Sequence, residues 1–102
     1  MREFEVYVPL HYNDGSAIEA QKLEALRQRL FDFFGGLTDT RQRNAGAWKV
    51  GNVAFHDEVV IYRVLAVKQH PARRFLMELK EQLERELRQQ EILIVERKVE
   101  VL

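Results

Sequence analysis

The sequence contains no cysteine, only two prolines and one tryptophan, and it carries no net charge. Without cysteine, disulfide bonds, thiolate metal sites and cysteine nucleophiles are excluded. The balance of 16 basic and 16 acidic residues argues against a domain built mainly to neutralise a nucleic-acid backbone, because such domains are strongly basic. No apolar run approaches the length of a membrane span, and Met1–Val6 lacks the apolar core of a signal peptide. We therefore expect a cytoplasmic protein without membrane contact.

The composition is that of a globular domain. Hydrophobic residues make up 46% and charged residues 31% of the 102 residues. This length is sufficient for one hydrophobic core without covalent staples. We expect a single domain that spans residues 1–102.

The longest β-favouring run is Val53–Val67, and it is apolar on both faces from Val59 onward. A strand of that kind lies in the middle of a sheet. Two phases of this strand are open. One directs Val60, Tyr62 and Val64 inward and leaves Val59, Ile61, Arg63 and Leu65 outward; the other does the reverse.

The other elements have clear boundary signals. Glu3–Leu10 alternates as a half-buried first strand does. Ser16–Glu19 fits a capping box, followed by a helix that ends at Gly35–Gly36. Pro71 suits the first position of a second helix. Glu91–Leu102 is then the last strand.

The segment Asp39–Gly46 has two interpretations, an edge strand with a bulge at Asn44–Gly46 or a loop between two short strands. Gly51–Asn52 then offers a tight turn. The resulting order is strand, helix, strand, strand, helix, strand. It predicts a ferredoxin-like βαββαβ two-layer sandwich, with a four-stranded antiparallel sheet and two helices on one face.

Such a fold leaves one face of the sheet uncovered. Glu3, Glu5 and Tyr7 would lie there beside apolar residues of the long strand. An uncovered apolar patch usually marks an interface, so we predict a homodimer that forms through this face. Alternatively, long basic side chains cover the patch with their stems, namely those of Arg63, Arg97 and Lys98.

His56–Glu58 is the densest cluster of titratable groups. A histidine two residues from a carboxylate can act as a general acid–base pair. Strand alternation, however, places His56 and Glu58 on one face and Asp57 on the other. No histidine spacing typical of a metal site is present, so we expect neither a metal nor another cofactor. Alternatively, His56–Glu58 has no functional role and is a polar part of a hairpin that faces solvent.

An enzyme would need a pocket near Trp48, His56 and Glu58. The candidate catalytic residues are His56, Glu58, Tyr62 and Arg63, and the candidate ligand-binding residues are Trp48, Tyr7 and His11. An aromatic beside a glycine can form the wall of a ligand pocket, although such a tryptophan also commonly covers the end of a core. Spacing alone does not bring these groups together.

Trp48 also has basic neighbours, Arg41, Arg43 and Lys49. Together they suggest weak binding of single-stranded nucleic acid, which the zero net charge disfavours. Equally, these charges would protect an edge strand from aggregation.

Three short motifs resemble a known group of proteins. They are Phe34–Thr38 (FGGLT), Gly46–Trp48 (GAW) and Asp57–Glu58 ahead of an apolar strand. The chain resembles small bacterial and phage-associated proteins with the pattern FGG-x-T, G-x-W and an acidic strand, over about its first two thirds. That resemblance implies the ferredoxin-like fold and no particular activity. It also implies that Gly35, Gly36, Thr38, Gly46, Trp48 and Glu58 form one recurring unit.

The leading hypothesis is therefore a binding or interaction module rather than a recognisable enzyme. Its partner would be a small molecule, another protein or a second copy of the chain. An uncovered apolar face combined with the lack of a convergent catalytic set supports this hypothesis.

Overall fold

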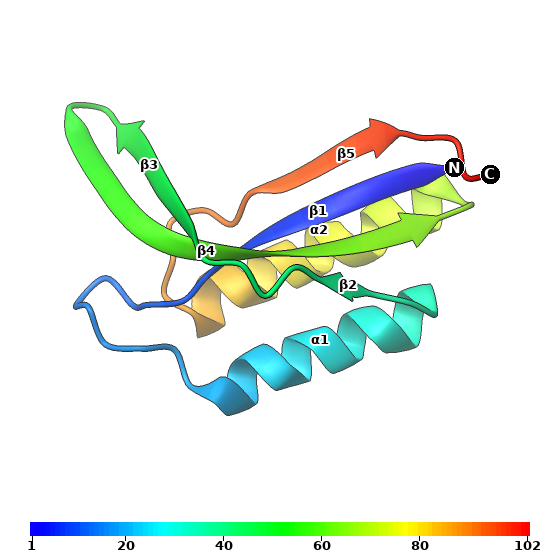
Figure 1. Ribbon diagram of the computed structural model, residues 1–102. Helices are drawn as coiled ribbons and strands as arrows, with labels where there is room; N and C mark the ends of the chain where they lie inside the picture. The colour runs from blue at the N-terminus through cyan, green and yellow to red at the C-terminus, as the bar shows by residue number, and fades with distance from the viewer.

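The computed structural model describes residues 1–102 and has two layers, a five-stranded antiparallel sheet and two helices that cover one of its faces (Figure 1). The elements are β1 (Arg2–Pro9), α1 (Ala20–Phe34), β2 (Thr38–Asp39), β3 (Asn44–Val50), β4 (Val53–Ala66), α2 (Gln69–Glu86) and β5 (Ile94–Lys98). The predicted α+β class is confirmed. Neither helix combines the length and apolar character needed to cross a membrane.

The sheet has β4 and β1 in its middle, with β2 beyond β4 and β5 beyond β1. The predicted four-stranded order is not an exact match, because the edge beside β4 is divided into β2 and β3. The loop Thr40–Arg43 separates them, and in it Arg41 has a positive φ of 52°. The Arg41 N–H donates to the Asp39 side chain at 2.9 Å. Of the two interpretations of Asp39–Gly46, the structure has the loop between two strands, which leaves the arrangement compatible with a ferredoxin-like sandwich.

The core lies between the sheet and the helices. The sheet contributes Phe4, Val6 and Val8 from β1 and Val60, Tyr62 and Val64 from β4. The helices contribute Leu26, Leu30, Ala72, Leu76, Leu79 and Leu83. The phase of β4 is thereby settled, and its alternate residues, including Arg63, lie on the open face, the sheet face without helices.

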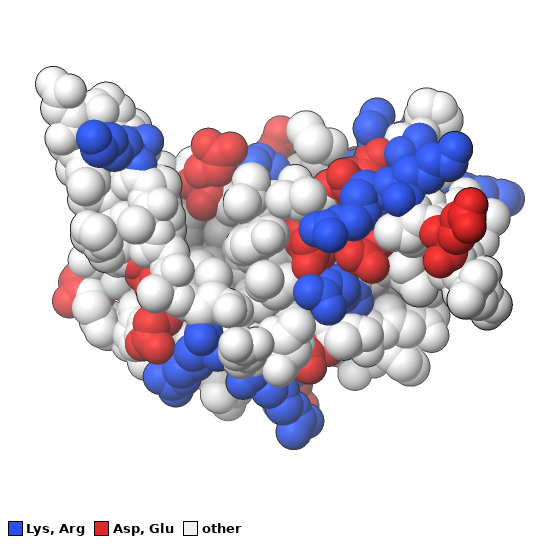
Figure 2. All heavy atoms as spheres, turned by 45° about the horizontal axis from the view of Figure 1, so that its top comes forward, with Lys and Arg blue, Asp and Glu red and all other residues white.

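The open face has an ion-pair cluster at its centre. Glu5 lies there but is only 3% exposed. Arg63 Nε donates to Glu5 Oε2 at 2.8 Å, and Arg97 donates to the other carboxylate oxygen. Figure 2, in which the top of Figure 1 comes forward, shows basic and acidic side chains mixed over part of this surface. Paired charges thus occupy part of this face, and pairing of two copies through it stays a prediction.

One hairpin leaves the plane of the sheet. β4 has 14 residues, whereas the eight-residue β1 pairs only with Val59–Ala66. The preceding Val53–Glu58 pairs with β3 across the turn Gly51–Asn52. In Figure 1 this β3–β4 hairpin (Asn44–Val59) rises away from the rest of the sheet, on the side opposite the helices. The hairpin therefore projects beyond one end of the sheet, on the side of the open face.

The start of α1 differs from the prediction. The helix begins at Ala20, and the predicted capping box does not form, because the Ser16 hydroxyl donates to Asp14 instead. The Ile18 N–H donates to the Leu10 carbonyl at 2.9 Å. This bond, together with the burial of Ile18, holds the preceding segment against the end of β1 and delays the helix.

The other predicted boundaries match the structure to different degrees. α2 begins at Gln69, so Pro71 is its third residue rather than its first. β5 covers only Ile94–Lys98 of the predicted last strand. The predicted C-terminal cap of α1 is confirmed, since Gly35 has a φ of 76° and its N–H donates to the Phe31 carbonyl at 2.8 Å.

Candidate functional site

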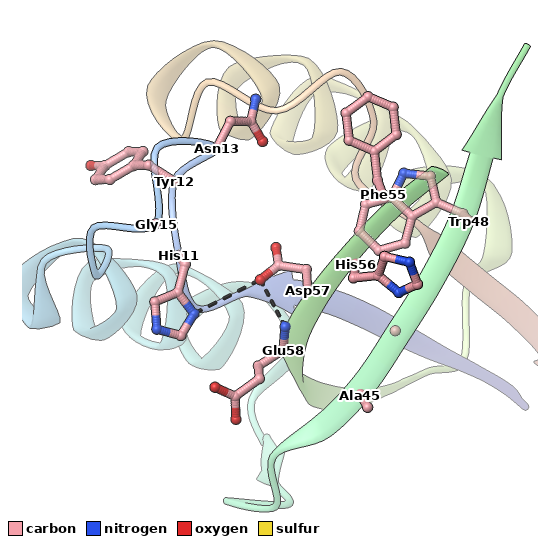
Figure 3. Close-up of a pocket in the computed structure, with 11 residues that line it drawn as sticks. His11, Tyr12, Asn13, Gly15, Ala45, Trp48, Phe55, His56, Asp57 and Glu58 are labelled. Atoms are coloured by element: carbon pink, nitrogen blue, oxygen red, sulfur yellow. Dashed lines mark hydrogen bonds and ion pairs between the residues drawn. The ribbon is translucent and has the colours of Figure 1, made fainter. Parts of the chain in front are cut away.

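A cleft of about 520 Å³ lies between the β3–β4 hairpin and the connection from β1 to α1 (Figure 3). It opens where β1 separates from β4. The Leu10 N–H, directly after β1, makes the last backbone bond to β4, to the Glu58 carbonyl at 3.0 Å. The cleft is lined by His11, Tyr12, Asn13, Gly15, Ala45, Gly46, Trp48, Phe55, His56, Asp57 and Glu58.

Two aromatic rings form one wall of the cleft. Trp48 and Phe55 are directly opposite each other in the hairpin, with ring centroids 6.3 Å apart and planes inclined by 16°. Gly46 makes room for this arrangement, because a Cβ atom there would lie 3.3 Å from the Trp48 ring. Trp48 remains 39% exposed. The wall is therefore a flat apolar surface that is open to a ligand.

A carboxylate and an imidazole lie next to this wall. Asp57 shares its face of β4 with Phe55, and Asp57 Oδ1 lies 3.8 Å from His11 Nδ1 (Figure 3). The same oxygen accepts the Glu58 N–H at 2.7 Å. Burial raises the pKa of Asp57, while the bond from Glu58 and the proximity of His11 act in the opposite direction. Asp57 is the acidic group best placed to contact a ligand in the cleft.

The cleft also borders a free strand edge. The Glu58 carbonyl points toward β1, as its bond to Leu10 shows. Because alternate residues of a strand present their backbone groups to the same edge, those of His56 and Ala54 point the same way. β1 does not extend far enough to pair with them. Backbone donors and acceptors are thus available beside the aromatic wall.

The structure places only some of the predicted site residues together. Trp48, His11, His56 and Glu58 all line the cleft. The side chains of His56 and Glu58 nevertheless leave β4 on the face opposite to Asp57, as strand alternation predicts. Glu58 also lies 3.7 Å from Arg43. His11, not His56, is the histidine that meets a carboxylate.

The other predicted residues lie elsewhere. Tyr62 is buried on the helix side of the sheet, where its hydroxyl accepts a bond from Arg27 at 3.0 Å and burial raises its pKa. Arg63 is bound to Glu5 on the open face. Tyr7 lies opposite Ile61 and does not line the cleft. These residues therefore do not form a catalytic set with His56.

The basic residues near Trp48 do not form one surface with it. Lys49 is adjacent to Trp48 in β3, so its side chain points to the opposite face of the hairpin. Arg43 lies near Glu58, and Arg41 belongs to the loop before β3. This arrangement gives no support to the hypothesis of nucleic-acid binding.

Sequence reasoning missed Phe55 and the role of Asp57. The position of Phe55 could have been predicted, because counting outward from the turn Gly51–Asn52 places Phe55 opposite Trp48. The contact between Asp57 and His11 depends on how β1 pairs with β4, and no local pattern specifies that register.

No protein-family model, curated protein or solved structure matches the chain. The resemblance stated from the short motifs therefore stays a prediction. No group of three or more His, Cys, Asp or Glu side chains is placed to hold a metal ion.

Proposed function

We propose that the protein is a ligand-binding module of the cytoplasm, and that its ligand binds in the cleft beside the β3–β4 hairpin. The observation that carries this proposal is the pair of nearly parallel rings of Trp48 and Phe55 next to the carboxylate of Asp57.

We also propose that the fold is ferredoxin-like. If β2 and β3 count as one interrupted edge strand, the order of elements becomes βαββαβ.

The chemistry of the cleft favours a planar ligand with a cationic, hydrogen-bond-donating group. A flat ring would pack on Trp48 and Phe55. A cation beside it would be attracted by Asp57 and by the faces of the aromatic rings. The carbonyl groups at the free edge of β4, those of Ala54 and His56, would accept further hydrogen bonds. An anionic ligand would meet the Asp57 carboxylate and be repelled.

The fluorescence of Trp48 tests this proposal directly, since it is the only tryptophan in the chain. Benzamidine combines a planar ring with an amidinium cation and serves as the probe. We expect it to change Trp48 emission in a saturable way, with a Kd of about 1 mM for so small a ligand. Benzoate, which has the same ring and the opposite charge, is expected to give no saturable change. Equal responses to both, or none to either, would refute the proposal.

A matched pair of variants separates the cleft from other surfaces. Asp57→Asn removes the charge but keeps an oxygen that accepts the Glu58 N–H. We expect it to weaken benzamidine binding at least about tenfold, because a hydrogen bond to a charged group contributes roughly 1.5–3 kcal/mol and about 1.4 kcal/mol corresponds to a factor of ten. Asp32→Asn changes an exposed carboxylate on α1 and is expected to leave binding unchanged.

A second candidate function is acid–base catalysis, and the contact between His11 and Asp57 favours it. A carboxylate beside a histidine orients the imidazole and stabilises its protonated form. Hydrolysis of a panel of nitrophenyl esters and phosphates tests this alternative. Turnover that His11→Gln abolishes, while benzamidine still binds, would support it. Lack of turnover in the unmodified protein would count against it for these reaction classes.

A further inference from the structure

The outer edge of β3 has no partner strand, because β3 pairs with β4 alone. Its free backbone groups can be identified. The Glu58 backbone points toward β1, and Glu58 lies opposite Ala45. Opposite residues of an antiparallel pair direct their backbone groups either toward each other or both away. The groups of Ala45 therefore point outward, and so do those of Ala47 and Lys49 at alternate positions.

This edge lacks the usual protection against strand addition. Natural edge strands carry charges, prolines or bulges that prevent pairing. Within β3, Lys49 is the only charged residue, and there is no proline. Arg41 and Arg43, which the sequence suggested as protecting charges, lie in the loop before the strand.

The hairpin also exposes apolar side chains. Val50 and Val53 at its tip are 48% and 57% exposed, and Trp48 is 39% exposed. In Figure 1 the hairpin stands away from the helices and from β5. A two-stranded hairpin is only marginally stable by itself in water. A third strand beside it would therefore add both burial and hydrogen bonds.

We propose that this strand is β3 of a second copy, added antiparallel about a two-fold axis at Ala47. The sequence of β3 fits this register. Ala47 lies opposite its own counterpart, and each Lys49 lies opposite an alanine, so the two ammonium groups do not oppose each other. Gly46 lies opposite Trp48 of the partner subunit, so the two Trp48 rings, each packed over the glycine of its own strand, would lie side by side. A β3–β3 pair would thus join the two sheets into one.

The size of the interface sets the expected affinity. Three pairs of outward-facing residues exchange about six hydrogen bonds in this register. At one bond per 100–200 Å², that number corresponds to roughly 600–1,200 Å² of buried surface. Interfaces of that size belong to weak, reversible complexes. We therefore expect a weak dimer that dissociates on dilution. It would use the β3 edge rather than the open face.

Charge substitutions at the two-fold axis test the register. Ala47→Glu and Ala47→Lys each place like charges directly opposite each other, so each variant alone should associate at least tenfold more weakly than the unmodified protein. An equimolar mixture should form a heterodimer. Sedimentation velocity over 5 μM to 1 mM protein measures both effects, and far-UV circular dichroism verifies that each variant is folded. A protein that stays monomeric at 1 mM, or variants that dimerise as well as the unmodified chain, would overturn the proposal.

Single cysteines provide an independent measurement, because the chain contains none. Directly opposite residues of neighbouring strands lie within the distance that a disulfide can span. With oxidised glutathione, Ala47→Cys should therefore form a covalent dimer at least tenfold faster than Leu65→Cys, which tests the open face. Faster cross-linking of Leu65→Cys, or equal rates, would place the contact elsewhere and contradict the proposal.

Discussion

Glu5 shows how strongly a residue's environment depends on distant parts of the chain. Alternation along β1 places it on the face without helices, where a carboxylate would normally be solvated. In the structure it is 3% exposed and lies between Arg63 of β4 and Arg97 of β5. The two arginines are 58 and 92 residues away in the sequence. Only the pairing of three strands makes Glu5 a buried anion.

Replacing Glu5 is expected to destabilise the fold. Glu5→Gln leaves two guanidinium groups without their carboxylate, which should lower the free energy of unfolding by about 1–3 kcal/mol. Glu3→Gln is the matched control, since Glu3 lies 3.9 and 3.6 Å from the same two arginines but is more exposed. We expect a loss of less than about 1 kcal/mol for that variant. Urea unfolding at pH 7 measures both, and equal losses would contradict the assigned role of Glu5.

Asp57 should make stability depend on pH in the opposite direction to a typical surface carboxylate. Burial raises the pKa of Asp57. A raised pKa means that the folded state binds the proton more tightly, so this contribution to stability is complete below the ordinary pKa of aspartate. It is lost as the pH rises through the folded-state pKa. Asp57→Asn should therefore gain stability relative to the unmodified protein as the pH rises from 3 to 7. Thermal unfolding across that range measures the difference in stability between Asp57→Asn and the unmodified protein. A difference that does not change with pH would refute the burial of this charge.

The residue scale also shows the limits of sequence reasoning about the site. Trp48 and Phe55 are separated by a two-residue turn and a few strand positions, so their contact follows from local counting. His11 and Asp57 belong to separate strands and meet only because of the register between β1 and β4. The sequence pointed to His56 because it neighbours acidic residues along the chain. Neighbours in a strand, however, point to opposite faces.

Among the elements, those with strong local signals were predicted well. The C-terminus of α1, the turn at Gly51–Asn52 and the long strand β4 all match their sequence patterns. The start of α1 does not, because Ile18 pairs with Leu10 and competes with the helix for the same residues. Sequence patterns thus specify an element's type better than a boundary that tertiary contacts determine.

The end of α1 supplies a prediction for an element. Gly35 has a φ of 76°, a conformation that costs about 1–2 kcal/mol for a residue with a side chain. Gly35→Ala should therefore lower the Tm by about 4–16 °C. Gly36→Ala is the control, since a side chain there meets no atom within 4 Å and Gly36 is not among the glycines with positive φ. We expect a change of less than 3 °C for it. Similar shifts for both in a calorimetric scan would show that the left-handed cap is not the cause.

For the whole molecule, the decisive feature is the mismatch between two strand lengths. β1 ends at Pro9, opposite Val59, while β4 begins six residues earlier at Val53. The excess strand pairs with β3, rises from the sheet and creates the cleft. The sequence contains both strands and predicts the two-layer sandwich, but the offset between strands distant in sequence follows from their packing on the helices.

The central claim is that this cleft binds a planar cation. Mapping of backbone amide shifts in a ¹⁵N NMR titration with benzamidine tests it most directly. We predict the largest shifts at His11, Gly46, Trp48 and Asp57, with little change in the two helices and at the open-face residues Glu3 and Leu65. Shifts spread evenly over the surface, or centred on the helices or the open face, would contradict the account.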